Sequence, residues 1–122
     1  MRVEFIAQAG VKIHTAHGSI LCDPWFNPAY YASWFPFPRN DGLDHAALGD
    51  TDYLYISHLH RDHFDPAWLA EYCRKDATVI LPAYPLPELE EALRGLGFTA
   101  FIRTSSGVPV RHRGLTFVVE SL

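Results

Sequence analysis

At 122 residues, with 48% hydrophobic side chains, the chain is long enough for one globular domain with an apolar core of its own. A formal net charge of −4 argues against binding to a nucleic-acid backbone, which requires a basic surface. The N-terminus lacks the apolar region of a signal peptide, and no apolar run approaches the roughly 18 residues of a membrane span. We therefore expect a single domain over residues 1–122 that is cytoplasmic and binds neither nucleic acid nor membrane.

The first 22 residues have the pattern of a strand meander. The stretches "RVEFIAQ" and "VKIHTA" alternate apolar and polar side chains with a period of two. Ala9-Gly10 separates them, and His17-Gly18 makes a tight turn into "SILCDP". This pattern predicts three antiparallel strands.

A long irregular loop is expected from Pro24 to Gly42. The segment is rich in prolines and aromatic rings and has no sustained period. Loops of this length are commonly functional, and two roles remain open: a lid packed on the core, or a wall that faces a substrate. We expect its rings to form an apolar surface that another chain or segment covers, with contributions from Trp25, Phe26, Trp34, Phe35 and Phe37.

The remaining residues predict strands alternating with two helices. "TDYLYIS" is a strand with Leu54 and Ile56 on one face and its tyrosines on the other, and His45 before it is expected on the surface. Asp65 and Pro66 begin the first helix as N-cap and first helical residue. The elements that follow are a strand, a helix and three short strands: "ATVILPA", "PELEEALRGLG", "FTAFIR", "VPVRH" and "LTFVVE". This order predicts a mixed α/β domain built in layers.

Four residues of metal-binding types follow the fourth strand within six positions. His58 and His60 are two residues apart, so in extended backbone both rings point to the same side and can bind one cation. Asp62 and His63 offer an oxygen and a nitrogen to a second position. Two metals roughly 3.5–4 Å apart make a hydrolytic site in which bound water is acidified. A solvated capping loop with incidental histidines is the alternative, and a cluster of this density disfavours it.

These residues also resemble a known family. "SHLHRDH" matches the H-x-H-x-D-H motif of the metallo-β-lactamase superfamily, and "ILCDPWF" resembles its first motif, an aspartate at the end of an early strand. The aromatic loop and "YISHLHRDHFDP" are most similar to the branch of CMP-N-acetylneuraminate hydroxylase-like and L-ascorbate-6-phosphate lactonase-like proteins. The resemblance implies an α/β fold: the N-terminal half of an αββα sandwich, with a mixed sheet and two helices.

The resemblance implies a role for each of five residues. His58 and His60 would bind a first metal and Asp62 and His63 a second, with Asp62 also acting in catalysis. Asp23 would orient the liganding histidines without touching metal. Two zinc ions are expected in the complete fold, and iron or manganese would also suit these donors.

The later motifs of the superfamily, which supply further ligands, have no clear counterpart in this chain. His112 is the only downstream histidine, and it lies on a strand entering a turn, so the sequence leaves it unassigned. Cys22 lies in an apolar run and is expected to be a buried small residue.

We therefore expect a metal-dependent hydrolase that acts on a small molecule. A di-iron redox enzyme remains an alternative, as does a metal-binding module that is inactive without a partner chain. The partner would be a second copy or the missing C-terminal half of the fold.

Overall fold

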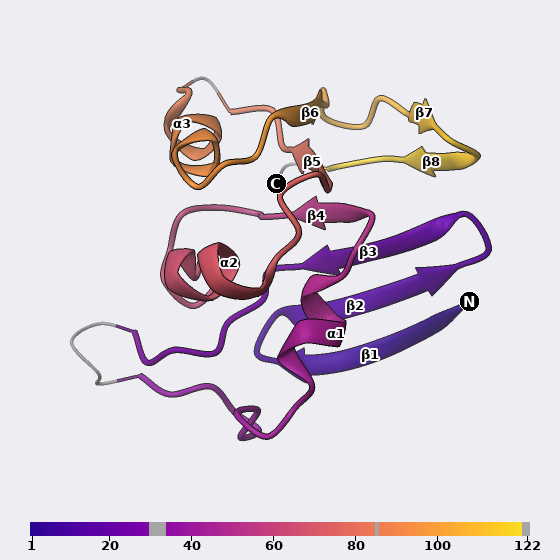
Figure 1. Ribbon diagram of the computed structural model, residues 1–122. Coiled ribbons are helices and arrows are strands. Elements are labelled where there is room, and N and C mark those ends of the chain that lie inside the picture. The colour runs from indigo at the N-terminus through magenta and orange to yellow at the C-terminus, as the bar shows by residue number, and fades with distance from the viewer. Residues whose placement is uncertain (30–33, 85, 121–122) are drawn as a thin grey trace.

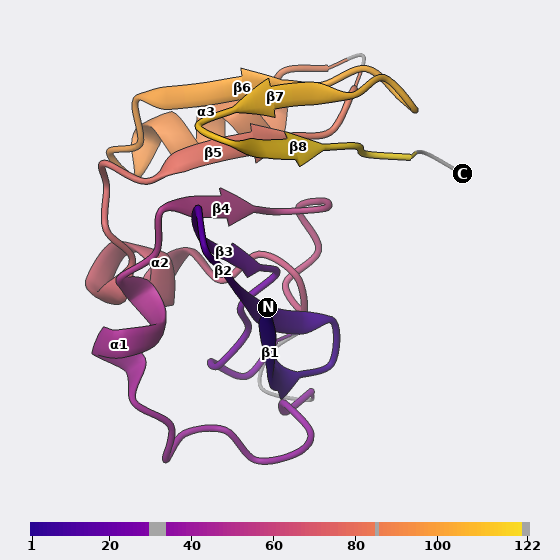
Figure 2. The same cartoon turned by 90° about the vertical axis from the view of Figure 1, so that its right-hand side faces the viewer.

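The structure is a computed structural model that describes residues 1–29, 34–84 and 86–120. Its main feature is a six-stranded sheet in which the strands follow one another in chain order, β1 to β6 (Figures 1 and 2). The strands are β1 (Arg2–Ala7), β2 (Gly10–Thr15), β3 (Gly18–Cys22), β4 (Tyr53–Tyr55), β5 (Thr78–Leu81) and β6 (Ala100–Arg103). A separate hairpin consists of β7 (Val110–His112) and β8 (Leu115–Phe117).

The sheet is antiparallel in its first half and parallel in its second. β1, β2 and β3 form the predicted meander, and Gln8 takes a positive φ of 54° in the first turn. From β3 to β6 each pair of neighbours is parallel, so chain segments must cross between them. Helices α2 (Pro66–Tyr72) and α3 (Glu88–Gly95) make two of these crossings, as the sequence indicated.

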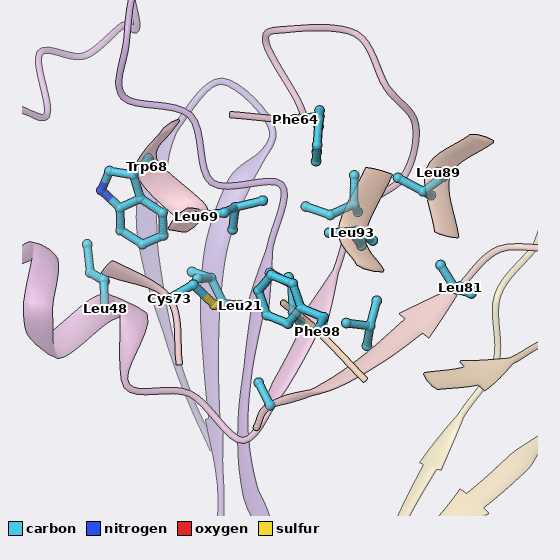
Figure 3. Packing of buried hydrophobic residues seen from close by; sticks show 14 of the residues in the cluster. Leu21, Leu48, Phe64, Trp68, Leu69, Cys73, Leu81, Leu89, Leu93 and Phe98 are labelled. Atoms are coloured by element: carbon cyan, nitrogen blue, oxygen red, sulfur yellow. The ribbon is translucent and has the colours of Figure 1, made fainter. Parts of the chain in front are cut away.

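Alternation along the strands divides the apolar side chains between two faces of the sheet. Leu54 and Ile56 belong to the larger cluster, which the helices cover, whereas Tyr53 lies in the cluster on the other face. Trp68 and Leu69 of α2 and Leu89 and Leu93 of α3 complete the helix-side core (Figure 3). On the opposite face, the hairpin and its neighbours pack against the sheet through Leu115, Phe117 and Val119.

A third helix in the described residues was not predicted. Helix α1 (His45–Gly49) contacts α2, and its N-cap is Asp44, whose side chain accepts a hydrogen bond from Ala47 N. Lys12 of β2 is buried and donates from Nζ to three carbonyls at the end of this helix: Ala47 (2.8 Å), Leu48 (3.1 Å) and Asp50 (3.1 Å). Burial lowers the pKa of Lys12, and the three carbonyls compensate by satisfying its donors.

The expectation that His45 lies on the surface was wrong. Its ring is partly buried, 4.6 Å from the Phe26 ring, and its Nδ1 accepts a hydrogen bond of 2.8 Å from Trp68 Nε1. Helix α1 carries this ring to the start of α2, so the helix that the sequence did not predict also explains the burial of His45.

The aromatic loop differs from expectation in its first residues. Trp25 and Phe26 are buried in the chain's own core, since Asp65 accepts hydrogen bonds from Phe26 N and Asn27 N and holds this segment against α2. They therefore do not contribute to an exposed apolar surface. The exposed rings of the loop are Trp34, Phe35 and Phe37, and the part of the predicted loop at 30–33 lies outside the described residues.

Gly49 allows α1 to approach the end of α2, which gives a stability prediction. A Cβ added at Gly49 would lie 2.0 Å from the carbonyl oxygen of Tyr72, whereas at Gly95, also the last residue of its helix, nothing lies within 4 Å. We expect Gly49→Ala to lower the free energy of unfolding by about 2 kcal/mol, a cost typical of overpacking. Urea denaturation followed by circular dichroism measures it. Gly95→Ala is the control and is expected to leave stability unchanged or raise it, and equal stabilities for the two variants would contradict the close packing.

Within the described residues, no helix is both long enough and apolar enough to cross a membrane.

Candidate metal centre

The candidate site lies where β3 and β4 end. These strands are parallel neighbours with Cys22 opposite Tyr55, so the residues that follow them emerge at the same edge of the sheet. Asp23 follows β3 directly, and its backbone N donates to Tyr55 O at 2.9 Å. Asp23 has a φ of 42°, a conformation that aspartate tolerates better than most residues and that turns the chain sharply at this point.

A tight turn folds the histidine segment back on itself. The carbonyl of His60 accepts hydrogen bonds from His63 N (2.9 Å) and Phe64 N (2.8 Å). Asp65 then caps α2 by accepting from Trp68 N, as its position in the sequence predicted. The turn places His63 beside His58, although the two are five residues apart.

The four predicted ligands lie close together. The ring centroid of His58 is 4.6 Å from that of His60 and 4.0 Å from that of His63. Nε2 of His63 is 3.5 Å from Oδ2 of the buried Asp62. Two donors bound to one metal at about 2.1 Å each lie roughly 3.0–3.5 Å apart, so this pair has the spacing of two ligands of a shared ion.

The arrangement is nevertheless not a closed coordination sphere. In the part of the chain that the structure describes, no group of three or more histidine, cysteine, aspartate or glutamate side chains is placed so that it could hold a metal ion.

Asp23 and Ser57 form a hydrogen-bonded support beneath the histidines. Ser57 donates to Asp23 from both its backbone N and its Oγ, each at 2.7 Å. Nδ1 of His63 lies 2.9 Å from Asp23 Oδ2 and 3.2 Å from Ser57 Oγ, and Nδ1 of His58 lies 2.8 Å from Ser57 Oγ. The sequence singled out Asp23 for this kind of role but missed Ser57, although Ser57 directly precedes the first histidine of the motif.

Proton counting assigns the tautomers of His58 and His63. The Asp23 carboxylate can only accept, so the single hydroxyl proton of Ser57 is used in donating to it. Each histidine must then donate from Nδ1, to Ser57 or to Asp23. Both rings therefore carry a proton on Nδ1, which leaves Nε2 as the nitrogen that can bind a metal.

The electrostatic surroundings also favour neutral imidazole at His58. Burial lowers its pKa, and the neighbouring rings of His63 and His60 lower it further. A ring that stays neutral needs to lose no proton when a cation binds.

The structure places two further side chains to which the sequence gave no role. Tyr84, which precedes α3, donates from its hydroxyl to the carbonyl of Ser57 and so reaches the histidine segment; no motif marked it. His112 lies 2.8 Å through Nδ1 from the hydroxyl of Tyr53, the first residue of β4, whereas the cluster follows the last. The structure therefore does not bring His112 to the candidate site.

Comparisons with known proteins give sequence relatives of much greater length. No family model matches the chain. It is 56% identical over 114 residues to a protein of Mycobacterium tuberculosis and 58% identical over 108 residues to one of Mycolicibacterium smegmatis, both named "Putative Rieske 2Fe-2S iron-sulfur protein". These matches cover 93% and 88% of this chain but 22% and 21% of the relatives, so the chain spans about a fifth of their length. A weaker match, 30% over 74 residues, covers 58% of this chain and 12% of the cytidine monophosphate-N-acetylneuraminic acid hydroxylase of Danio rerio.

Solved structures of similar shape identify the fold. An isothiocyanate hydrolase from Delia radicum gut bacteria matches 92% of this chain and 44% of its own with a TM-score of 0.68 and 16% identity. CmlA, a diiron beta-hydroxylase from Streptomyces venezuelae, matches 89% of this chain and 21% of its own with a TM-score of 0.62 and 22% identity. The predicted fold class is thus confirmed: the chain has the mixed α/β fold of one half of a metallo-β-lactamase sandwich, with α1 as an additional short helix.

Proposed function

We propose that this chain supplies the histidine–aspartate side of a metal centre in a metal-dependent enzyme, and that the metal is iron used in an oxidative reaction. The observation that carries the proposal is the convergence of three imidazoles and one carboxylate, with two rings held by Ser57 and Asp23 in the metal-binding tautomer. A support of this kind stabilises liganding rings, and a merely solvated loop has no need of it.

Each residue has a proposed part in the site. His58 and His60 hold one metal, and Asp62 and His63 hold a second, with Asp62 close to the reacting atoms. When bound, the metals supply Lewis acidity and, if they are iron, electron transfer. Ser57 and Asp23 hold the rings of His58 and His63 at fixed angles.

The iron–sulfur cluster in the names of the mycobacterial relatives does not fit this chain. A Rieske cluster needs two cysteine thiolates together with two histidines. The chain has two cysteines, Cys22 and Cys73, but they do not lie at a shared site. Cys73 belongs to the helix-side core and Cys22 packs on the opposite face of the sheet. Burial raises the pKa of Cys22 to about 12 and that of Cys73 to about 11, which disfavours the thiolate form.

We therefore place any Rieske cluster of those relatives in the four-fifths of their length that this chain does not match. The histidine–aspartate site would be a second, separate centre in such a protein. The diiron centre in the name of one structural neighbour favours iron over the zinc expected from the sequence.

A zinc-dependent hydrolase is the second candidate. The structural neighbours include an isothiocyanate hydrolase, and imidazole and carboxylate donors suit zinc as well as iron. In either case we propose a small-molecule substrate, and the net charge of −4 disfavours a nucleic acid.

Completion of the site needs a partner. Metal sites normally collect three or four protein donors at each ion, more than these residues provide. We propose that the second αβ half of the fold supplies them, with a second copy of the chain as the alternative. On this view residues 1–122 are a partial domain and, taken alone, have weak activity at most.

The test is the metal content of the protein purified from cells grown without added metal. We expect iron in excess of zinc by elemental analysis, and no acid-labile sulfide associated with residues 1–122. If the protein contains zinc and no iron, and has lactonase or phosphodiesterase activity, the zinc-dependent hydrolase is the correct function and the iron proposal is wrong. A protein with no bound transition metal, and no affinity for added iron or zinc, would contradict both.

A further inference from the structure

A groove of about 270 Å³ lies beside the predicted metal ligands. His58 and His60 line it on one side, and Tyr84 and Leu86, from the segment between β5 and α3, line it on the other. The groove is therefore bounded by two segments that meet where Tyr84 donates its hydrogen bond to the carbonyl of Ser57.

The lining is mainly apolar and is open to solvent. Leu59 and Leu89 contribute further apolar surface, and Tyr84 and Leu86 remain 48% and 60% exposed. Single exposed apolar side chains are ordinary, but here two of them border a hollow whose far side carries candidate metal ligands. Binding sites for small molecules have this composition: mostly apolar walls with a few polar groups.

The charged side chain of the groove is acidic. Among the described residues that line it there is no lysine or arginine, and Glu88 in the first turn of α3 is the one carboxylate. Among the described residues Glu88 has no salt-bridge partner, unlike Glu90 two residues later, which pairs with Arg94 and Arg103. The Tyr84 phenol adds no charge, because burial, together with the charge of Asp23, raises its pKa.

We propose that this groove binds the apolar part of the substrate, and that the part bound there is uncharged or cationic, such as an aromatic or aliphatic group bearing an amine. The proposal rests on the proposed metal centre, because it places the bound group within reach of His58 and His60. An anionic group at the Glu88 end of the groove would meet that carboxylate without a compensating cation among the described lining side chains, whereas an anionic group elsewhere in the substrate could bind the metals.

Saturation-transfer NMR on the metal-free protein, in which no bound ion attracts an anion, tests the groove with three probes that share one ring: benzylamine, benzyl alcohol and benzoate. We expect benzylamine to bind most tightly and benzoate least. Leu86→Ser should weaken benzylamine binding about tenfold through loss of apolar contact. Glu88→Gln should lower the ratio of benzylamine affinity to benzyl alcohol affinity about threefold, as expected for the loss of a solvent-exposed charge pair. Val108→Ser, which changes another exposed apolar residue, is the control and should have no effect.

The outcomes separate this proposal from the metal centre. If the protein binds metal but none of the probes, or if Leu86→Ser and Val108→Ser bind benzylamine equally, the groove proposal is wrong and the metal centre stands. Benzoate binding as tight as benzylamine would overturn the assignment of charge. A protein that binds the probes but no metal would remove the metal centre and leave the groove as a binding site. A dimer that Leu86→Ser converts to monomer would show that a second copy fills the groove instead, which also overturns the proposal.

Discussion

Replacing His58 and His60 together by alanine is expected to abolish metal binding. The two rings lie with centroids 4.6 Å apart and are the proposed ligands of the first metal. Their loss leaves Asp62 and His63, which are too few donors for a stable site. Elemental analysis after dialysis should show the metal content fall from that of the parent protein to near zero.

The matched control for this variant removes two histidines from the meander. His14 lies in β2 and His17 in the turn that follows it, and neither is among the cluster residues. The variant His14→Ala with His17→Ala should keep the metal content of the parent. Equal metal content in both double variants would show that the ions bind elsewhere.

Substituting Asp23 by asparagine is expected to weaken metal affinity about 10–100-fold, the range typical of lost support for liganding histidines. The carboxylate accepts from Ser57 N, Ser57 Oγ and His63 Nδ1, whereas an amide has one oxygen and turns an NH₂ group toward one of these donors. Competition with a chromophoric chelator measures the affinity. Asp41→Asn is the control, because Asp41 pairs only with exposed Arg39.

Ser57→Ala should produce a loss of similar size by the same route, since the hydroxyl is the link between Asp23 and His58. Because both side chains belong to one network, the double variant should lose less than the sum of the two single losses. An Asp23→Asn protein with parental affinity would mean that Asp23 only turns the chain into Pro24.

The sequence pattern predicted the elements that contacts between neighbouring residues stabilise. The alternation in residues 2–22 and the turn at His17-Gly18 gave the meander, and Asp65 with Pro66 gave the start of α2. Helix α1 was missed because its five residues have no helical periodicity of their own and its end is held by Lys12 from a distant strand. Short helices that depend on such long-range contacts carry little signal in the sequence.

The sequence indicated the proposed metal ligands of the candidate site and Asp23, but not the contacts of Ser57 and Tyr84 there. The dense cluster from His58 to His63 and the aspartate after β3 marked the residues that the fold brings together. The contacts of Ser57 and Tyr84 depend on the parallel pairing of β3 with β4 and on the path of the chain before α3, which no local pattern specifies. For the same reason the sequence did not predict the burial of Trp25 and Phe26, whose segment is held by Asp65 through Phe26 N and by Asn40 through Trp25 O.

The most direct test of the central claim is X-ray absorption spectroscopy at the metal edge of the loaded protein. The proposed site contains imidazole and carboxylate donors and no thiolate. We predict a shell of nitrogen and oxygen atoms at roughly 2.0–2.2 Å with imidazole scattering, and no bound metal to give an edge signal in the His58→Ala, His60→Ala variant. A sulfur shell at about 2.3 Å that survives this double substitution would contradict it, because the metal would then be held by cysteine.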